Sequence, residues 1–309
     1  MNLQQLVLGG VLLVQLIVVG IILLLNAAGS QKPKSFLQFD QKEADRVVVS
    51  SGDESIELIR GSDGWKMSNG NPVDESKVSR VLEKLADVQP DWPVATSDSA
   101  AQRFEVSRDK FQKQVSVYSG DKTLADVYLG TSPSFRKVHA RHTRGGDIYS
   151  IEFSNHEAGT STSSWLDRSL LHPQGAITSL EKVGDFALTK TDDGWIIDSG
   201  EELDESKVRS YIDRFESLNV FEISDKDVSD IDTKEEFVIT DDKGSYSLVI
   251  YHLVTSDDWV ATSDRFNDHY GVVSYQGKEL FKELGDLVPD AELVDEDDEL
   301  ESIEEVLTD

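Results

Sequence analysis

The chain contains an internal repeat that constrains its fold more than any other feature. Residues 47–88 recur at 177–218 without a gap, each position displaced by 130. The tripeptide Asp-Gly-Trp at 63–65 returns at 193–195, and a fixed offset of this kind indicates a duplicated folding unit. The repeated residues are typical of a turn, a core aromatic residue and a helix start. The repeat therefore predicts an architecture and no catalytic chemistry.

Each copy predicts three strands followed by one helix. In the first copy, apolar runs at 46–50 and 55–60 flank a Ser-Gly-Asp turn and predict a hairpin, and residues 65–67 predict a third strand. Asp74, a good N-cap, then precedes apolar residues with the i, i+3, i+4, i+7 spacing of a helix face. That face consists of Val78, Val81, Leu82 and Leu85 in the first copy and of Val208, Tyr211, Ile212 and Phe215, behind Asp204, in the second.

Further strands are predicted outside the clear repeat. Their apolar runs are separated by glycines, and their lengths and register drift between the copies. The runs are 114–118, 124–129, 138–141 and 147–153 in the first half and 236–240, 246–252, 258–262 and 270–275 in the second. We expect an α+β fold, with two tandem duplicated units of antiparallel strands plus one packed helix each, after an N-terminal transmembrane helix.

The expected domains follow from these patterns. Serine and threonine concentrate at 160–164, before Trp165–Leu171, which we interpret as the hinge, and we expect the unit boundary near His172-Pro173. The domains are then an anchor at 1–30, a first α+β unit at 36–172, a second at 173–285 and an acidic tail at 286–309.

The N-terminal segment 6–25 is apolar apart from Gln15. About 20 helical residues rising 1.5 Å each match a hydrocarbon core about 30 Å thick, so the segment predicts a transmembrane anchor. A cleavable signal peptide is the alternative, because Ala27-Ala28-Gly29 resembles a cleavage site, although no Lys or Arg precedes the apolar run. By charge alone, Lys32 and Lys34 favour a cytoplasmic location for the side that follows.

The chain is strongly acidic, with a net charge of −29. Residues 286–309 hold twelve Asp and Glu and no Lys or Arg, and we expect this tail to be solvated and disordered. So much negative charge repels phosphate backbones and anionic lipid surfaces, so nucleic acid is not expected as a partner. The chain has no cysteine, which excludes disulfides, thiolate metal sites and cysteine nucleophiles.

Several short motifs occur in an order that resembles one bacterial family. After the apolar segment they are Asp63-Gly64-Trp65, the capped helix, Val127-Tyr128-Leu129-Gly130, His139-Ala140-Arg141, Ile148-Tyr149-Ser150-Ile151 and the run 165–171. Over most of residues 36–280 the chain is thereby similar to the family of domain of unknown function 4340. Phe104-Glu105-Val106 stands where the family has Tyr-Gly-Leu, so we expect the turn there to differ.

The resemblance implies a membrane-anchored, extracytoplasmic protein of the bacterial inner membrane. Members often occur alongside ABC transporter components similar to those of gliding-motility systems. The resemblance brings no catalytic residues, and the extracytoplasmic placement that it implies conflicts with the weak charge signal of Lys32 and Lys34.

Few residues are candidates for a site. Tryptophan faces bind sugars and cations, but Trp65 and Trp195 are each expected to pack under their own helix. His139 and His142 have a spacing that places them on opposite faces of a strand, which argues against a shared metal ion.

Other chemistry-bearing residues lack the spacing that a known site needs. Ser164 and Ser169 have no Gly-x-Ser-x-Gly elbow, and no glycine-rich phosphate-binding loop is present. Asp241-Asp242, Asp257-Asp258 and the run 295–299 lack the pattern of a calcium loop and are interpreted as solvated acidic faces. We therefore predict no catalytic, cofactor-binding or metal-binding residues.

Two functions remain open on the sequence. The first is a non-enzymatic, single-pass membrane protein that contacts the bilayer through residues 6–25 and serves as an interaction or accessory subunit of a membrane complex. An ABC transporter permease is the partner that the resemblance suggests. The alternative is an extracytoplasmic protein that captures a small molecule, glycan or cation between the two units.

Overall fold

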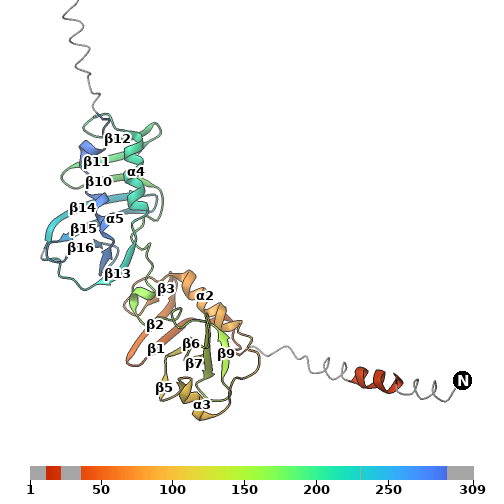
Figure 1. Ribbon diagram of the computed structural model, residues 1–309. Helices are drawn as coiled ribbons and strands as arrows, with labels where there is room; N and C mark the ends of the chain where they lie inside the picture. Colours follow the sequence, from red (N-terminus) through yellow and green to blue (C-terminus); the bar gives the residue numbers. More distant parts are fainter. Residues whose placement is uncertain (1–11, 22–35, 230, 291–309) are drawn as a thin grey trace, which may run out of the picture. The chain divides into compact units, whose positions relative to one another are not determined.

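A computed structural model describes residues 12–21, 36–229 and 231–290 of the chain. The chain divides into two compact units, Met1–Ser164 and Trp165–Asp309. Each unit is built on one large sheet whose strands all pair antiparallel, with few helices (Figure 1). The α+β class expected from the repeat is confirmed.

The first unit contains a seven-stranded sheet in the order β3-β2-β1-β6-β7-β8-β9. Val47 and Val49 alternate inward along β1, and the predicted face of α2 is buried, so the sheet and the helix share one core. The elements are η1 (Gln41–Glu43), β1 (Arg46–Ser51), β2 (Glu54–Gly61), β3 (Gly64–Met67), α2 (Glu75–Ala86), α3 (Asp98–Arg103), β4 (Val106–Ser107), β5 (Lys110–Phe111), β6 (Lys113–Ser119), β7 (Lys122–Leu129), β8 (Lys137–His142), β9 (Tyr149–Glu152) and η2 (Thr162–Ser164).

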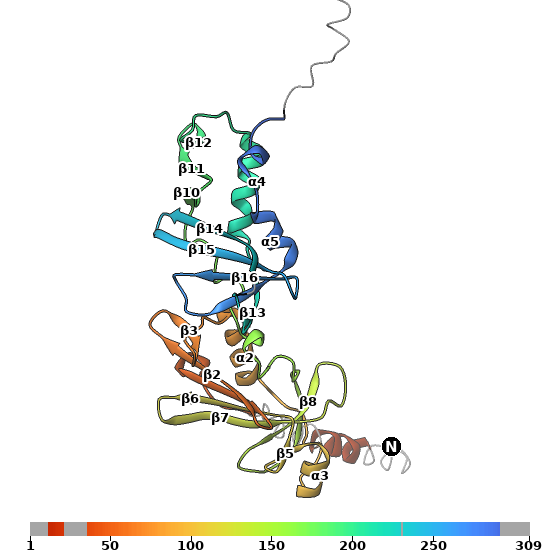
Figure 2. The same ribbon diagram turned by 90° about the vertical axis from the view of Figure 1, so that its left-hand side faces the viewer.

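The second unit contains an eight-stranded sheet in the order β12-β11-β10-β14-β15-β16-β17-β13. Helices α4 and α5 contact each other and lie along one side of this sheet (Figure 2). The elements are β10 (Ile177–Lys182), β11 (Phe186–Thr191), β12 (Gly194–Ile197), α4 (Glu205–Glu216), β13 (Val220–Ser224), β14 (Ile231–Asp241), β15 (Gly244–Leu253), β16 (Asp258–Ser263), β17 (His269–Val272), α5 (Ser274–Leu280) and η3 (Leu284–Asp286).

The repeat extends well beyond the residues in which the sequence shows it. Strands β3-β2-β1-β6-β7-β8-β9 correspond in order to β12-β11-β10-β14-β15-β16-β17. The predicted caps also form, because the Asp74 side chain accepts from the Lys77 N–H and the Asp204 side chain accepts from the Lys207 N–H. The two units therefore share the order of seven strands and a capped first helix.

Several local elements differ from the prediction. In the first unit, α3 and the β4-β5 hairpin fill the connection between α2 and β6. In the second unit the shorter connection after α4 forms β13, which pairs with β17. The predicted strand at 270–275 is wrong at its end, because the chain turns into α5 at Ser274.

The chain passes from one unit to the next after Ser164, ahead of the expected position near His172. Residues beyond Ser164 bond to the second unit, where the Val220 N–H donates to the Arg168 carbonyl (2.9 Å). The Arg265 guanidinium donates to the carbonyls of Leu170 (3.1 Å) and His172 (3.0 Å). The segment interpreted as a hinge is therefore held by the second unit.

A helix covers residues 12–21, inside the predicted anchor at 6–25. Among the helices of the described residues, none has both the length and the apolar content needed to cross a membrane. The rest of the predicted anchor and the run 291–309 of the acidic tail lie outside the described residues.

We predict that Arg265→Ala lowers the free energy of unfolding by about 2 kcal/mol. The substitution leaves two backbone carbonyls without their charged donor and removes a guanidinium that stacks on Tyr246, 3.9 Å from the ring centroid. Urea unfolding measures the change. Arg209→Ala is the control, because its side chain is 74% exposed and only 3.9 Å from Glu205, and it should change the free energy by about 0.5 kcal/mol or less.

Candidate functional site

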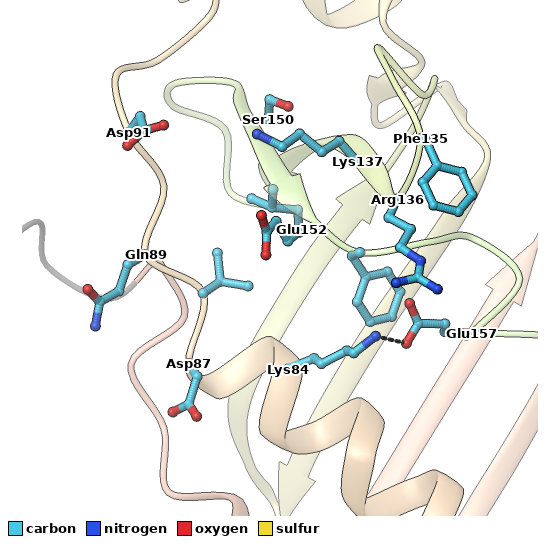
Figure 3. A pocket seen from close by; sticks show the side chains of 13 residues that line it. Lys84, Asp87, Gln89, Asp91, Phe135, Arg136, Lys137, Ser150, Glu152 and Glu157 are labelled. Carbon is cyan, nitrogen blue, oxygen red and sulfur yellow. Dashed lines mark hydrogen bonds and ion pairs between the residues drawn. The ribbon is translucent and has the colours of Figure 1, made fainter.

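The first unit contains a cavity of about 940 Å³. One wall is the end of α2 with residues 87–91, and the opposite wall is the start of β8 with β9 and the residues that follow it (Figure 3). Its volume lies within the range of about 300–1,000 Å³ that is usual for ligand-binding sites. The residues that line it are Lys84, Asp87, Val88, Gln89, Asp91, Phe135, Arg136, Lys137, Ser150, Ile151, Glu152, Phe153 and Glu157.

Local backbone contacts hold the two walls. Where α2 ends, Val88 is buried and its carbonyl accepts from the Phe36 N–H (2.9 Å). On the other wall, the Lys137 N–H donates to the Ser134 carbonyl (3.1 Å), which closes a tight turn before β8. Arg136 in this turn has φ +57°, a left-handed conformation that is uncommon for a residue with a side chain. The turn thereby holds Phe135 and Arg136 at the rim of the cavity (Figure 3).

The cavity is lined by charges of both signs. Lys84 Nζ lies 2.5 Å from Glu157 Oε2, and this ion pair joins the two walls (Figure 3). The Arg136 guanidinium lies over the Phe135 ring, 5.0 Å from its centroid. Ser150 is the one hydroxyl among the lining residues, and no histidine stands among them to act as its base. The arrangement is suited to binding polar groups.

Two aromatic side chains project into solvent beside this cavity. Phe135 is 85% exposed, and Trp92, which directly follows the lining residue Asp91, is 88% exposed. Among the described residues, no other large apolar side chain is as exposed. Exposed aromatic residues are enriched at protein interfaces, so this part of the surface has the composition of a contact area.

The two repeated tryptophans differ in environment. Trp65 is 6% exposed, in line with the expected packing, and its backbone N–H donates to Glu75 Oε1 of α2 (3.1 Å). Trp195 is only half-buried and lines a cavity of about 290 Å³ beside α4. The equivalent Glu205 carboxylate faces Arg209 instead. Trp195 therefore lies beside its own helix but is less completely covered than Trp65.

The two histidines considered for a metal site serve separate packing roles. His139 Nδ1 donates to the Thr131 carbonyl (2.8 Å), and its ring stacks on Phe104 with 4.0 Å between centroids. His142 contacts the Phe36 ring at 4.5 Å. Burial penalises the charged form of each imidazole and lowers the pKa of both residues below the usual value of 6.5.

The aspartate pairs are used by local turns and ion pairs. Burial would raise the pKa of Asp241, but bonds from the backbone N–H groups of Lys243, Gln174 and Gly244 bring it below its usual value. The bond from His252 lowers the pKa of Asp257, and Asp258 pairs with Lys226. Within the described ranges no group of three or more potential metal ligands comes together, and the run 295–299 lies outside them.

The serines considered as nucleophiles bond to local partners. Ser164 Oγ lies 2.7 Å from Ser161 Oγ, and Ser169 Oγ donates to Asp167 Oδ1 (2.7 Å). Neither bond involves a histidine, the usual base beside a serine nucleophile.

Fold and cavity together define a duplicated antiparallel α+β protein whose first unit carries a polar, aromatic-rimmed cavity. Residues 65–236, more than half of the chain, match the family described as Domain of unknown function (DUF4340). The chain belongs to this family. All residues that line the cavity lie inside the matched range. No curated protein and no solved structure matches the chain.

Sequence reasoning missed this cavity, because its residues come from three separate segments that carry no repeat signal. Pro90 and Pro93, which flank Asp91 and the exposed Trp92, were a sequence signal of an irregular connection at the surface. No sequence pattern marked Phe135, which owes its exposure to the turn before β8.

Proposed function

We propose that this protein is a non-enzymatic, membrane-anchored interaction module that serves as an accessory subunit of a membrane complex. The observation that supports it best is the pair of exposed aromatic side chains, Trp92 and Phe135, beside the charged cavity of the first unit. Aromatic anchors surrounded by polar groups are typical of protein–protein contact sites. An ABC transporter permease is the partner that we propose.

Membrane attachment is proposed through residues 6–25. The described helix at 12–21 supports it, because Leu12, Leu13 and Leu16 are exposed there without a packed core. Apolar side chains of this kind are stable when lipid surrounds them. Phe36 bonds to Val88 and belongs to the first unit, so few residues of the sequence separate the apolar segment 6–25 from the unit that carries the cavity.

We further propose that both units lie outside the cytoplasm of a bacterial cell. The chain has no cysteine, so Asp121→Cys, in the exposed turn between β6 and β7, supplies a single thiol. We expect a membrane-impermeant thiol reagent to label this variant in intact spheroplasts as completely as after lysis, which is the control. Labelling that requires lysis contradicts the placement.

The contact role predicts that Trp92→Ser and Phe135→Ser each reduce recovery of the partner about tenfold or more. Each change removes an exposed aromatic anchor while leaving the core intact, so the free energy of unfolding should stay within about 0.5 kcal/mol of the wild type. The measurement is affinity purification from gently solubilised membranes, with quantitative mass spectrometry of the membrane proteins that remain bound.

Val183→Ser is the matched control for these variants. Val183 is a 46% exposed apolar residue between β10 and β11 of the second unit, so it tests a similar surface change away from the cavity. Recovery with Val183→Ser should equal that of the wild type. Equal recovery with all three variants, or the absence of any stoichiometric membrane protein, contradicts the proposal.

The cavity at Trp195 favours a second candidate function, capture of a small organic cation by the second unit. Trp195 lines this cavity together with the carboxylates of Asp213 and Glu216, for which no ion pair forms in the described part of the chain. Lys190 and Arg209 also line it. An aromatic face with nearby carboxylates attracts ammonium groups. Its volume of about 290 Å³ suits a small ligand.

Choline and its uncharged isostere 3,3-dimethylbutanol test this second candidate by isothermal titration calorimetry. We expect saturable binding of choline alone, weakened about tenfold by Asp213→Asn because a carboxylate is lost. Trp92→Phe, which changes an exposed tryptophan elsewhere, should leave the affinity unchanged. Equal binding of both compounds, or of neither, rules the site out.

A further inference from the structure

The two sheets differ at one edge. In the second unit, β17 has a neighbour on each side, because it pairs with β16 and with β13. Its counterpart β9 pairs with β8 alone and forms the last strand of the first sheet. The first unit therefore lacks a strand at the position that β13 fills in the second.

The reason lies in the sequence that follows the first helix of each unit. Counting on from the equivalent residues Val88 and Leu218, the five positions of β13 (Val220–Ser224) correspond to residues 90–94. These residues are Pro-Asp-Trp-Pro-Val, and proline has no N–H to donate to a neighbouring strand. The segment contacts β9 only at its beginning, where Val94 and Ala95 exchange bonds of 2.8 Å with Ile148.

Beyond Ile148, the edge of β9 presents unpaired backbone groups. His139 uses its N–H and C=O toward Thr131 and Gly130, so its pair with Ser150 across β8 and β9 is a non-hydrogen-bonded pair. The N–H and C=O of Ser150 consequently point away from β8. They share this direction with those of Ile148, which bond to Val94 and Ala95. No described residue pairs with the outward backbone groups of Ser150.

The cavity of about 940 Å³ lies along this edge, and Ser150, Ile151 and Glu152 all line it (Figure 3). Residues 87–91 form the far wall, and Figure 3 shows Asp91 across the cavity from Ser150. An extended segment placed there would lie beside β9. On one side of the sheet its neighbour is the buried Ile151. On the other side its neighbours are Glu152 and Lys137, which pair across β9 and β8. A segment whose apolar and polar residues alternate would match these two sides, because successive side chains of a strand point to opposite faces.

We propose that the free edge of β9 accepts an extended segment of a partner protein as an added strand, in the place that β13 occupies in the second unit. This inference rests on the proposed function, and it specifies how the partner is held. The partner's backbone bonds to the outward N–H and C=O of Ser150 and continues the sheet, which is a known mode of peptide recognition. Its apolar residue packs beside Ile151, in the cavity that Phe135 also lines.

The test compares Ser150→Pro with Ser150→Ala. Proline removes the outward N–H and leaves the bonds between β8 and β9 in place, because the residue pair His139/Ser150 contributes none of them. Alanine removes the same hydroxyl and keeps the N–H. Random heptapeptides displayed on phage are selected on the full-length protein in detergent, and the affinities of selected synthetic peptides are measured by fluorescence anisotropy.

We expect peptides with alternating apolar residues that bind the wild type and Ser150→Ala equally and bind Ser150→Pro about tenfold more weakly. Unfolding in urea confirms that both variants are folded. Selection of no peptide, or of peptides that bind folded Ser150→Pro as tightly as the wild type, overturns the proposal.

Partner recovery from membranes separates this inference from the proposed function. If Ser150→Pro retains a membrane partner that Trp92→Ser loses, the protein is an interaction module but β9 is not where the partner binds. If peptides bind at β9 while no membrane protein is recovered with the wild type, the strand site stands and the accessory role fails.

Discussion

Both units depend on the packing of one amphipathic helix against an antiparallel sheet. A sheet with one apolar face is stable only when that face is covered, and α2 and α4 provide the cover with equivalent buried residues. An aspartate at the start of each helix satisfies backbone N–H groups that would otherwise lack partners. The two sheets also share the order of seven strands, and the surface features that differ between the units lie around this common core.

Sequence reasoning predicted the elements whose pattern is local. The hairpin of β1 and β2, the caps at Asp74 and Asp204 and the buried helix faces all form as expected, because turn residues and helical periodicity act over a few positions. Strand β13 was missed because its pairing with β17 joins residues about fifty positions apart in the sequence, beyond the reach of any local pattern. The end of the strand predicted at 270–275 failed for a similar reason, since α5 is held by contacts with α4 and β16.

The candidate site was less predictable than the fold. Its walls come from α2, the turn before β8 and β9, and only the folded chain brings them together. Duplication predicted the place of Trp195 beside α4 but not its incomplete burial, because an identical tripeptide does not fix the residues around it. The copies also differ in the glutamate at the helix start, because Glu75 accepts from the backbone N–H of Trp65 whereas Glu205 lies 3.9 Å from Arg209.

The shortness of β9 has a consequence for solubility. A long, flat and apolar free edge recruits other chains into fibrils, whereas β9 has four residues and ends in a glutamate. Pairing that continues past Ser150 soon meets charged side chains, and at the other end Val94 and Ala95 already occupy Ile148. A free edge as short as this offers few backbone groups on which further chains could add as strands. It can remain uncovered during synthesis without making the protein prone to aggregation.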